Sequence, residues 1–199
     1  MARWIDLRPI AGLVSLFAFA GCSKPVPVSP PDVLVTEASF RCIRDMTPVR
    51  GFFVANLLGD LQATVAAANS RAGATYPPGS MLQVIPTTAM VKHQPGRSPA
   101  TNDWEFIELG VTAGGVNILG RGFAEMNMRS GLNCLRCHEP AKAAHDLVCE
   151  QTHGCLPIPL TPAMLRGLQN TDPRCPEIDL PQDQRDALAA LARGAPPRP

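Results

Sequence analysis

Short apolar runs separated by turn-forming residues dominate the chain between positions 50 and 123. Runs of a few β-branched and aromatic residues bounded by Gly and Pro are typical of buried strands. The stretches Tyr76-Pro77-Pro78-Gly79 and Gly114-Gly115 have the composition of tight turns. The pattern predicts strands at 50–56, 81–85, 89–93, 104–109 and 116–123.

Helical periodicity is found in two other stretches. Between Asp60 and Ala72, apolar residues recur every three or four positions, which predicts a helix with Asp60 as N-cap and Gly73 as its stop. A closing helix is expected from Gln182 to Arg193. The predicted fold class is α+β, mainly an antiparallel sheet with a few helices.

The first residues have the pattern of an export signal. Arg3 and Arg8 precede an apolar run at 10–20, as in a signal peptide, and the run is too short for a permanent membrane span. Phe19-Ala20-Gly21-Cys22 resembles a bacterial lipobox, which predicts removal of residues 1–21 and a lipid on Cys22. The alternative is ordinary cleavage that leaves Cys22 as a thiol.

A proline-rich segment follows the predicted cleavage site. Residues 22–33 contain four prolines and are expected to form a semi-rigid extended tether. Together with the lipid, the tether predicts an exported protein, anchored on the periplasmic side of a bacterial membrane.

Cys134-Leu135-Arg136-Cys137-His138 carries the most specific chemistry in the chain. A Cys-x-x-Cys-His run is the attachment site of a c-type haem. Cys134 and Cys137 would form the thioether bonds, and His138 would be an axial ligand of the iron. One covalent haem c, near the C-terminal end of the sheet domain, is therefore expected.

Other interpretations of the motif remain open at this stage. A zinc site is one, with ligands added from Cys149, His153 and Cys155. A redox dithiol is another, although the motif does not follow a βαβ pattern. A haem-free structural lipoprotein is a third. His138 and the export signal favour haem.

The chain has seven cysteines. With Cys22 assigned to lipid and two to haem, Cys42, Cys149, Cys155 and Cys175 remain, an even number suited to an oxidising compartment. Three connectivities are possible. The most local pair is Cys149–Cys155, which would leave Cys42–Cys175. Alternatively, one or more of the four stay free and buried.

Composition limits the classes of partner. Hydrophobic residues make up 45% and the formal net charge is +1, which gives no argument for nucleic acid binding. After the signal, the length suits one domain with its own core. We expect the haem domain at 34–149 and, at 150–199, an extension with disulfides and the closing helix.

Five pieces of the sequence, in order, resemble the β-sheet cytochromes of the cytochrome P-460 family, which include the cytochrome c′-beta proteins. Together they span roughly half of the chain. They are Arg50-Gly51-Phe52-Phe53-Val54-Ala55-Asn56, Tyr76-Pro77-Pro78-Gly79, Ala89-Met90-Val91-Lys92, Asn102-Asp103-Trp104-Glu105-Phe106, and Asn133-Cys134-Leu135-Arg136-Cys137-His138 followed by His145-Asp146-Leu147-Val148.

The resemblance implies a dimer-prone antiparallel sheet and a five-coordinate haem with His138 proximal. Some relatives oxidise hydroxylamine with a haem cross-linked to a lysine on the strand after the aromatic-Pro-x-Gly turn. Here that strand, 79–85, contains no lysine, and Lys92 lies on the next one. A plain thioether-bound haem is therefore expected.

The expected function is an exported mono-haem protein that binds or converts small nitrogen ligands, NO and possibly hydroxylamine, and exchanges electrons with a redox partner protein. Whether it is an enzyme stays open. The alternative is a six-coordinate electron-transfer cytochrome. Met164 is the only methionine after the motif and lies in a proline-containing segment, which argues against a His/Met carrier.

Further haem contacts are expected from the sheet and from the motif itself. Lys92 and His93 are neighbours on a strand and should face opposite ways, one toward haem and one toward solvent. His93 is a candidate sixth ligand, and Arg136 a candidate partner of a propionate. An apolar distal pocket is expected from Phe52, Met81, Val84, Met90, Trp104 and Phe106.

Overall fold

The computed structural model describes residues 1, 31–150 and 152–194. The predicted signal peptide from residue 2 onward, Cys22 and most of the tether lie outside the described residues. Residues 31–33, the last three tether positions, are described, and the Val33 side chain is buried against the sheet. No helix among the described residues combines the length and apolar character needed to cross a membrane.

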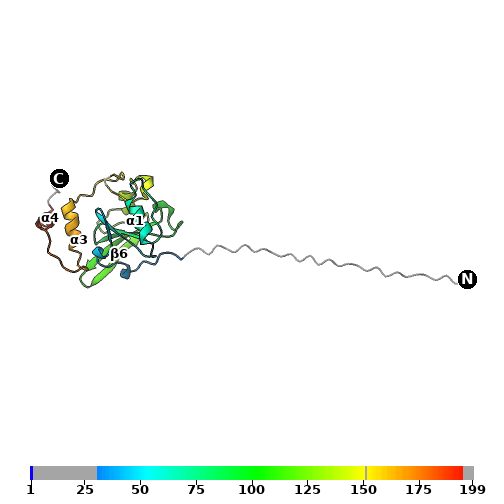
Figure 1. The fold of residues 1–199 in the computed structure, drawn as a ribbon, viewed down its shortest axis with the longest axis horizontal. Coiled ribbons are helices and arrows are strands. Elements are labelled where there is room, and N and C mark those ends of the chain that lie inside the picture. The colour runs from blue at the N-terminus through cyan, green and yellow to red at the C-terminus, as the bar shows by residue number, and fades with distance from the viewer. Residues whose placement is uncertain (2–30, 151, 195–199) are drawn as a thin grey trace.

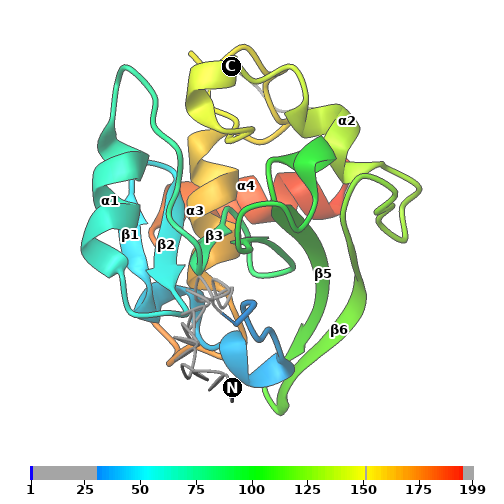
Figure 2. The same ribbon diagram turned by 90° about the vertical axis from the view of Figure 1, so that its right-hand side faces the viewer.

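A six-stranded antiparallel sheet forms the centre of the molecule, with the strands in chain order. Figures 1 and 2 show the fold from two sides; in Figure 2 the sheet curves from β1 and β2, which lie beside α1 (Leu61–Asn69), to the long hairpin of β5 and β6. The α+β prediction is confirmed. The strands are β1 (Thr47–Val49), β2 (Phe52–Asn56), β3 (Ser80–Gln83), β4 (Thr88–Lys92), β5 (Trp104–Thr112) and β6 (Gly115–Gly122).

The predicted strand at 50–56 is in fact preceded by a separate strand. Arg50, with φ +50°, and Gly51 form a tight turn between β1 and β2. Pro48 lies within β1, at the edge of the sheet, where a missing N–H costs no ladder hydrogen bond. Proline and the turn obscured this strand in the sequence.

Both predicted helices are present, although α1 ends at Asn69 and not at the predicted stop Gly73, and the helix at 162–170 was not predicted. Asp60 caps α1, accepting a hydrogen bond from the Ala63 amide at 3.3 Å. Thr161 accepts from the Met164 amide at 3.1 Å with Pro162 next to it, a favourable start that the sequence analysis did not recognise. The helices are α1 (Leu61–Asn69), α2 (Cys134–His138), α3 (Pro162–Asn170) and α4 (Gln182–Ala192), with 3-10 helices η1 (Glu37–Ser39), η2 (Ile43–Asp45), η3 (Pro99–Thr101) and η4 (Ala143–His145).

Each face of the sheet has its own apolar cluster. One face packs against α1 and the segment around α2 through Phe52, Val54, Leu82, Met90, Trp104 and Phe106. The other face is covered by the N-terminal segment through Val33, Val35 and Phe40. Met81 belongs to this second cluster, so its predicted place in a pocket with Phe52 and Phe106 is wrong, because alternate residues of β3 face opposite sides.

The C-terminal extension packs on the sheet domain and is cross-linked to it. Gln169 of α3 donates to the carbonyls of Gly51 and Val84 at 2.9 and 2.8 Å. Two disulfides are formed, Cys42–Cys175 and Cys149–Cys155, which is the connectivity that the local-pair argument predicts.

Candidate functional site: the Cys-x-x-Cys-His helix and its supporting loop

The motif forms the short helix α2, just beyond the end of the β5–β6 hairpin (Figure 2). Asn133 caps it, accepting from the Arg136 amide at 3.0 Å. The spacing puts Cys134 and Cys137 one turn apart on the same side of the helix. Both thiols are free. Cys134 is half-buried against the first apolar cluster, and Cys137 is exposed.

His138 is oriented by a backbone carbonyl. Its Nδ1 lies 2.9 Å from the Leu147 carbonyl oxygen, and since a carbonyl only accepts, Nδ1 carries the proton. The neutral ring then has an unprotonated Nε2, the arrangement in which a metal-binding histidine is held. The ring of Phe106 lies 5.2 Å from the His138 ring. Burial lowers the pKa of His138, although the Leu147 bond opposes this effect.

The environment of Cys134 does not suit a redox dithiol. Burial, with the nearby Cys137 and Glu108, raises the pKa of Cys134 to about 11. Thiol–disulfide chemistry depends on a thiolate, and reactive cysteines have a lowered pKa. Cys134 therefore lacks the lowered pKa that is typical of a reactive thiol.

The zinc interpretation loses two of its three additional ligands. Cys149 and Cys155 are bonded to each other, so only His153 remains of the three. In the described part of the chain, no group of three or more His, Cys, Asp or Glu side chains is arranged to hold a metal. Among the described residues, Cys134 and Cys137 are therefore the cysteines that no disulfide engages.

Lys92 and Trp104 both bond to Asp146, a residue of the loop after α2. The Lys92 Nζ lies 2.8 Å from both Asp146 carboxylate oxygens, and the Trp104 Nε1 donates to the Asp146 carbonyl at 2.7 Å. All three side chains are buried. Lys92 and Trp104 therefore hold this loop against the sheet, whereas Arg136 is exposed. Direct contact of Lys92, Trp104 and Arg136 with haem stays a prediction.

His93 faces the other side of the sheet from Lys92, as predicted, but it does not face solvent. Its Nδ1 lies 2.8 Å from Asp32 and its Nε2 2.9 Å from Glu105. Arg121 forms an ion pair with the same Glu105. Because both ring nitrogens are engaged on the face opposite to α2, the prediction of His93 as a sixth ligand is wrong for this arrangement.

The other predicted pocket residues do lie on the side of α2. Phe52, Met90, Trp104 and Phe106 belong to the apolar cluster that Cys134 and Leu135 contact, and Val84 packs against it. Met126, which the sequence analysis did not select, is buried in the same cluster, and its carbonyl accepts from the Cys134 amide at 3.0 Å. This cluster therefore lies between the sheet and α2.

Asp146 and Leu147 contact Lys92 and His138, and the sequence analysis gave neither of them a role. Their only signal was the resemblance of Asp146-Leu147-Val148 to the tail of a family motif. Nothing local in the sequence reveals that Asp146 pairs with Lys92, which lies 54 positions away.

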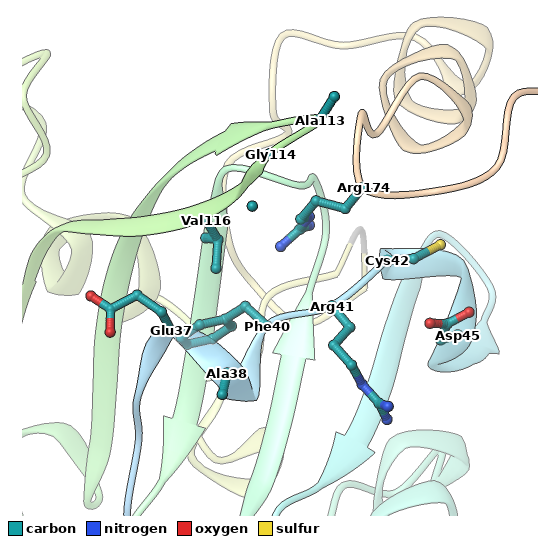
Figure 3. Close-up of a pocket in the computed structure, with 11 residues that line it drawn as sticks. Glu37, Ala38, Phe40, Arg41, Cys42, Asp45, Ala113, Gly114, Val116 and Arg174 are labelled. Carbon is teal, nitrogen blue, oxygen red and sulfur yellow. The ribbon is translucent and has the colours of Figure 1, made fainter.

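A cavity of about 550 Å³ is found elsewhere, at the end of the molecule opposite α2. It is lined by η1, η2, the β5–β6 turn and Arg174. Figure 3 shows Arg174 extending toward Val116 and Arg41 pointing away. Its lining includes none of the haem-motif residues, and Cys42, its only cysteine, is bonded to Cys175.

Comparison of the chain with protein-family models, curated proteins and solved structures finds no match.

Proposed function

We propose that this chain is an exported mono-haem c protein that binds or converts small nitrogen ligands and exchanges electrons with a redox partner. Cys134 and Cys137 would hold the haem and His138 would bind its iron. The observation that carries the proposal is the Nδ1 bond from His138 to the Leu147 carbonyl. It prepares Nε2 as a metal ligand one residue after two free thiols.

The residues present fit this prosthetic group. Cys134 and Leu135 contact an apolar sheet face whose buried members include Phe106 and Met90, and Phe106 is next to His138. Bound haem would supply a redox-active iron able to bind diatomic molecules. The chain contributes attachment, orientation of the proximal ligand and an apolar surface with few hydrogen-bond donors, which favours neutral ligands such as NO.

The resemblance to the cytochrome P-460 family supports the same proposal. In relatives that oxidise hydroxylamine, the cross-linked lysine lies on the strand that corresponds to β3, which has none. Lys92 is engaged by Asp146 and by the Asn102 carbonyl. Both observations favour ligand binding at an uncross-linked haem over hydroxylamine oxidation.

A six-coordinate electron carrier is the second candidate, and one observation favours it. Met90 and Met126 are buried in the cluster that Cys134 contacts, and a methionine thioether is a common second axial ligand in carriers. Met164 lies in α3, outside that cluster.

Mass and absorption spectra of the full chain, expressed with haem-maturation machinery, test the proposal. We expect one covalent haem, lost in C134A/C137A and kept in R136A, which changes an exposed residue of the same motif. A high-spin ferric spectrum that shifts with NO supports ligand binding, and a low-spin spectrum indifferent to NO indicates the carrier. Wild-type protein without a haem adduct contradicts both.

A further inference from the structure

Asp146 and Leu147 adopt an unusual backbone conformation directly beside His138. Their φ angles are +52° and +62°, in the left-handed region that residues with side chains rarely occupy. They follow η4 and turn the chain so that the Leu147 carbonyl faces the His138 ring at 2.9 Å. Two consecutive left-handed residues without glycine persist only when their surroundings hold them.

Three separate segments hold Asp146. Lys92 of β4 contacts both carboxylate oxygens at 2.8 Å. The Tyr76 amide, before β3, donates to Oδ2 at 2.9 Å. Trp104 of β5 donates from Nε1 to the main-chain carbonyl at 2.7 Å. Both the carboxylate and the carbonyl of this residue are therefore tied to the sheet.

The charges at this point are balanced inside the protein. The side chains of Lys92 and Asp146 are 7% and 5% exposed, and the ammonium also lies 5.1 Å from the Trp104 ring. A buried ion pair with full hydrogen bonding fixes geometry, while either charge alone would be strongly unfavourable. Burying this pair costs desolvation free energy, and what the pair provides in return is a fixed orientation of the loop.

We propose that Asp146, held by Lys92, is a positioning residue for the axial histidine. It holds the backbone next to Leu147, whose carbonyl accepts the hydrogen bond from the His138 Nδ1–H, and so sets the ring orientation and the donor strength of Nε2 toward iron. The inference rests on the proposed haem function. A firm Nδ1–H hydrogen bond makes the ring a stronger electron donor, which strengthens the iron–histidine bond and favours ferric iron.

Two double variants test this inference without leaving a buried charge unpaired. K92M/D146A removes the pair and places alanine where φ is positive. K92M/D146N removes the charges but keeps a residue that tolerates left-handed φ and still accepts from Tyr76. The matched control is D172N/R174M, a buried ion pair in the C-terminal extension with side chains 0% and 5% exposed.

Because thioether bonds retain the haem, the axial bond can be measured in every folded variant. We expect K92M/D146A to lower the ferrous iron–histidine stretching frequency and to make the reduction potential more positive. K92M/D146N should change both in the same direction but less, and the control should leave both unchanged. Unchanged values in folded K92M/D146A, or an equal shift in the control, would overturn the inference. If K92M/D146A does not fold, an unchanged stretching frequency and reduction potential in K92M/D146N would overturn the inference.

A haem-independent measurement separates this inference from the proposed function. In full-length chain expressed without haem maturation, ¹⁵N NMR should show His138 protonated at Nδ1 in wild type and in the control. The K92M/D146A variant should show a mixture of both tautomers. A wild type without haem under maturation conditions would refute the haem proposal, while a wild-type tautomer in the variant would refute the positioning role.

Discussion

His93 shows how a single residue links the beginning of the chain to the sheet. Burial lowers the pKa of His93, but its hydrogen bonds to Glu105 and Asp32 raise it above the ordinary value. The same contacts lower the pKa of Glu105 and of Asp32 against the effect of burial. Arg121 on β6 and Arg97 in the loop after β4 supply the remaining charges around this site.

This arrangement predicts a pH-dependent stability. A raised folded pKa means that the stabilisation by protonated His93 is fully present below the unfolded value of 6.5 and is lost as pH rises through the folded pKa. The two carboxylates act in the opposite direction, losing their contribution on acidification. Urea midpoints measured from pH 6 to 9 should fall with rising pH in wild type and fall less in H93Q. An equal slope in H93Q would contradict this assignment.

At the scale of elements, the loop after α2 is located by a close backbone contact as well as by Asp146. Gly73 follows α1 with φ +91°, and a Cβ there would lie 2.1 Å from the Ala144 carbonyl oxygen of η4. Since η4 leads directly into Asp146 and Leu147, the approach of these two segments helps to fix the carbonyl that His138 uses.

Substitution of Gly73 is therefore expected to lower the stability of the protein and to displace the loop beside His138. G73A should lower the free energy of unfolding by more than the roughly 1–2 kcal/mol expected for left-handed φ alone, because η4 must also move. G59A is the matched control, with φ +92° and nothing within 4 Å of an added Cβ. Chemical denaturation measures both, and equal losses would show that the contact with η4 has no energetic weight.

At the scale of the whole molecule, one disulfide joins the two ends of the described fold. Cys42 adjoins η2 and Cys175 precedes α4, with a sequence separation of 133. Asp172 strengthens the same junction by accepting from the Ile43 amide at 2.9 Å. The extension is thus part of the folded domain, although it carries none of the motif residues.

Removing this cross-link should destabilise the protein substantially. C42S/C175S is expected to lose about 2–5 kcal/mol of unfolding free energy, since a long closed loop restricts the unfolded chain most. C149S/C155S, which opens a separation of six, should lose less by that argument. Urea denaturation of both variants checks the order, and a larger loss in C149S/C155S would contradict it.

The sequence by itself determined the features that depend on neighbouring residues. The capped helix after Asp60, the turns at Gly79 and Gly114-Gly115, the Cys-x-x-Cys-His spacing and the most local disulfide all follow from interactions within a few positions. The elements that were not predicted have local causes too. Pro48 lies within the edge strand β1, and Pro162 is the first residue of α3; in both places a proline argued against regular structure.

Only the tertiary structure decided what surrounds the motif. Sequence could say that Lys92 and His93 face opposite ways, but not that each would be buried in its own ion pair, with Asp146 on one face and with Asp32 and Glu105 on the other. Those partners come from segments 12 to 61 positions away, and their pairing is fixed by strand register and packing. The Cys134–His138 motif predicts which residue would bind iron, and the fold supplies the Leu147 carbonyl that orients its ring.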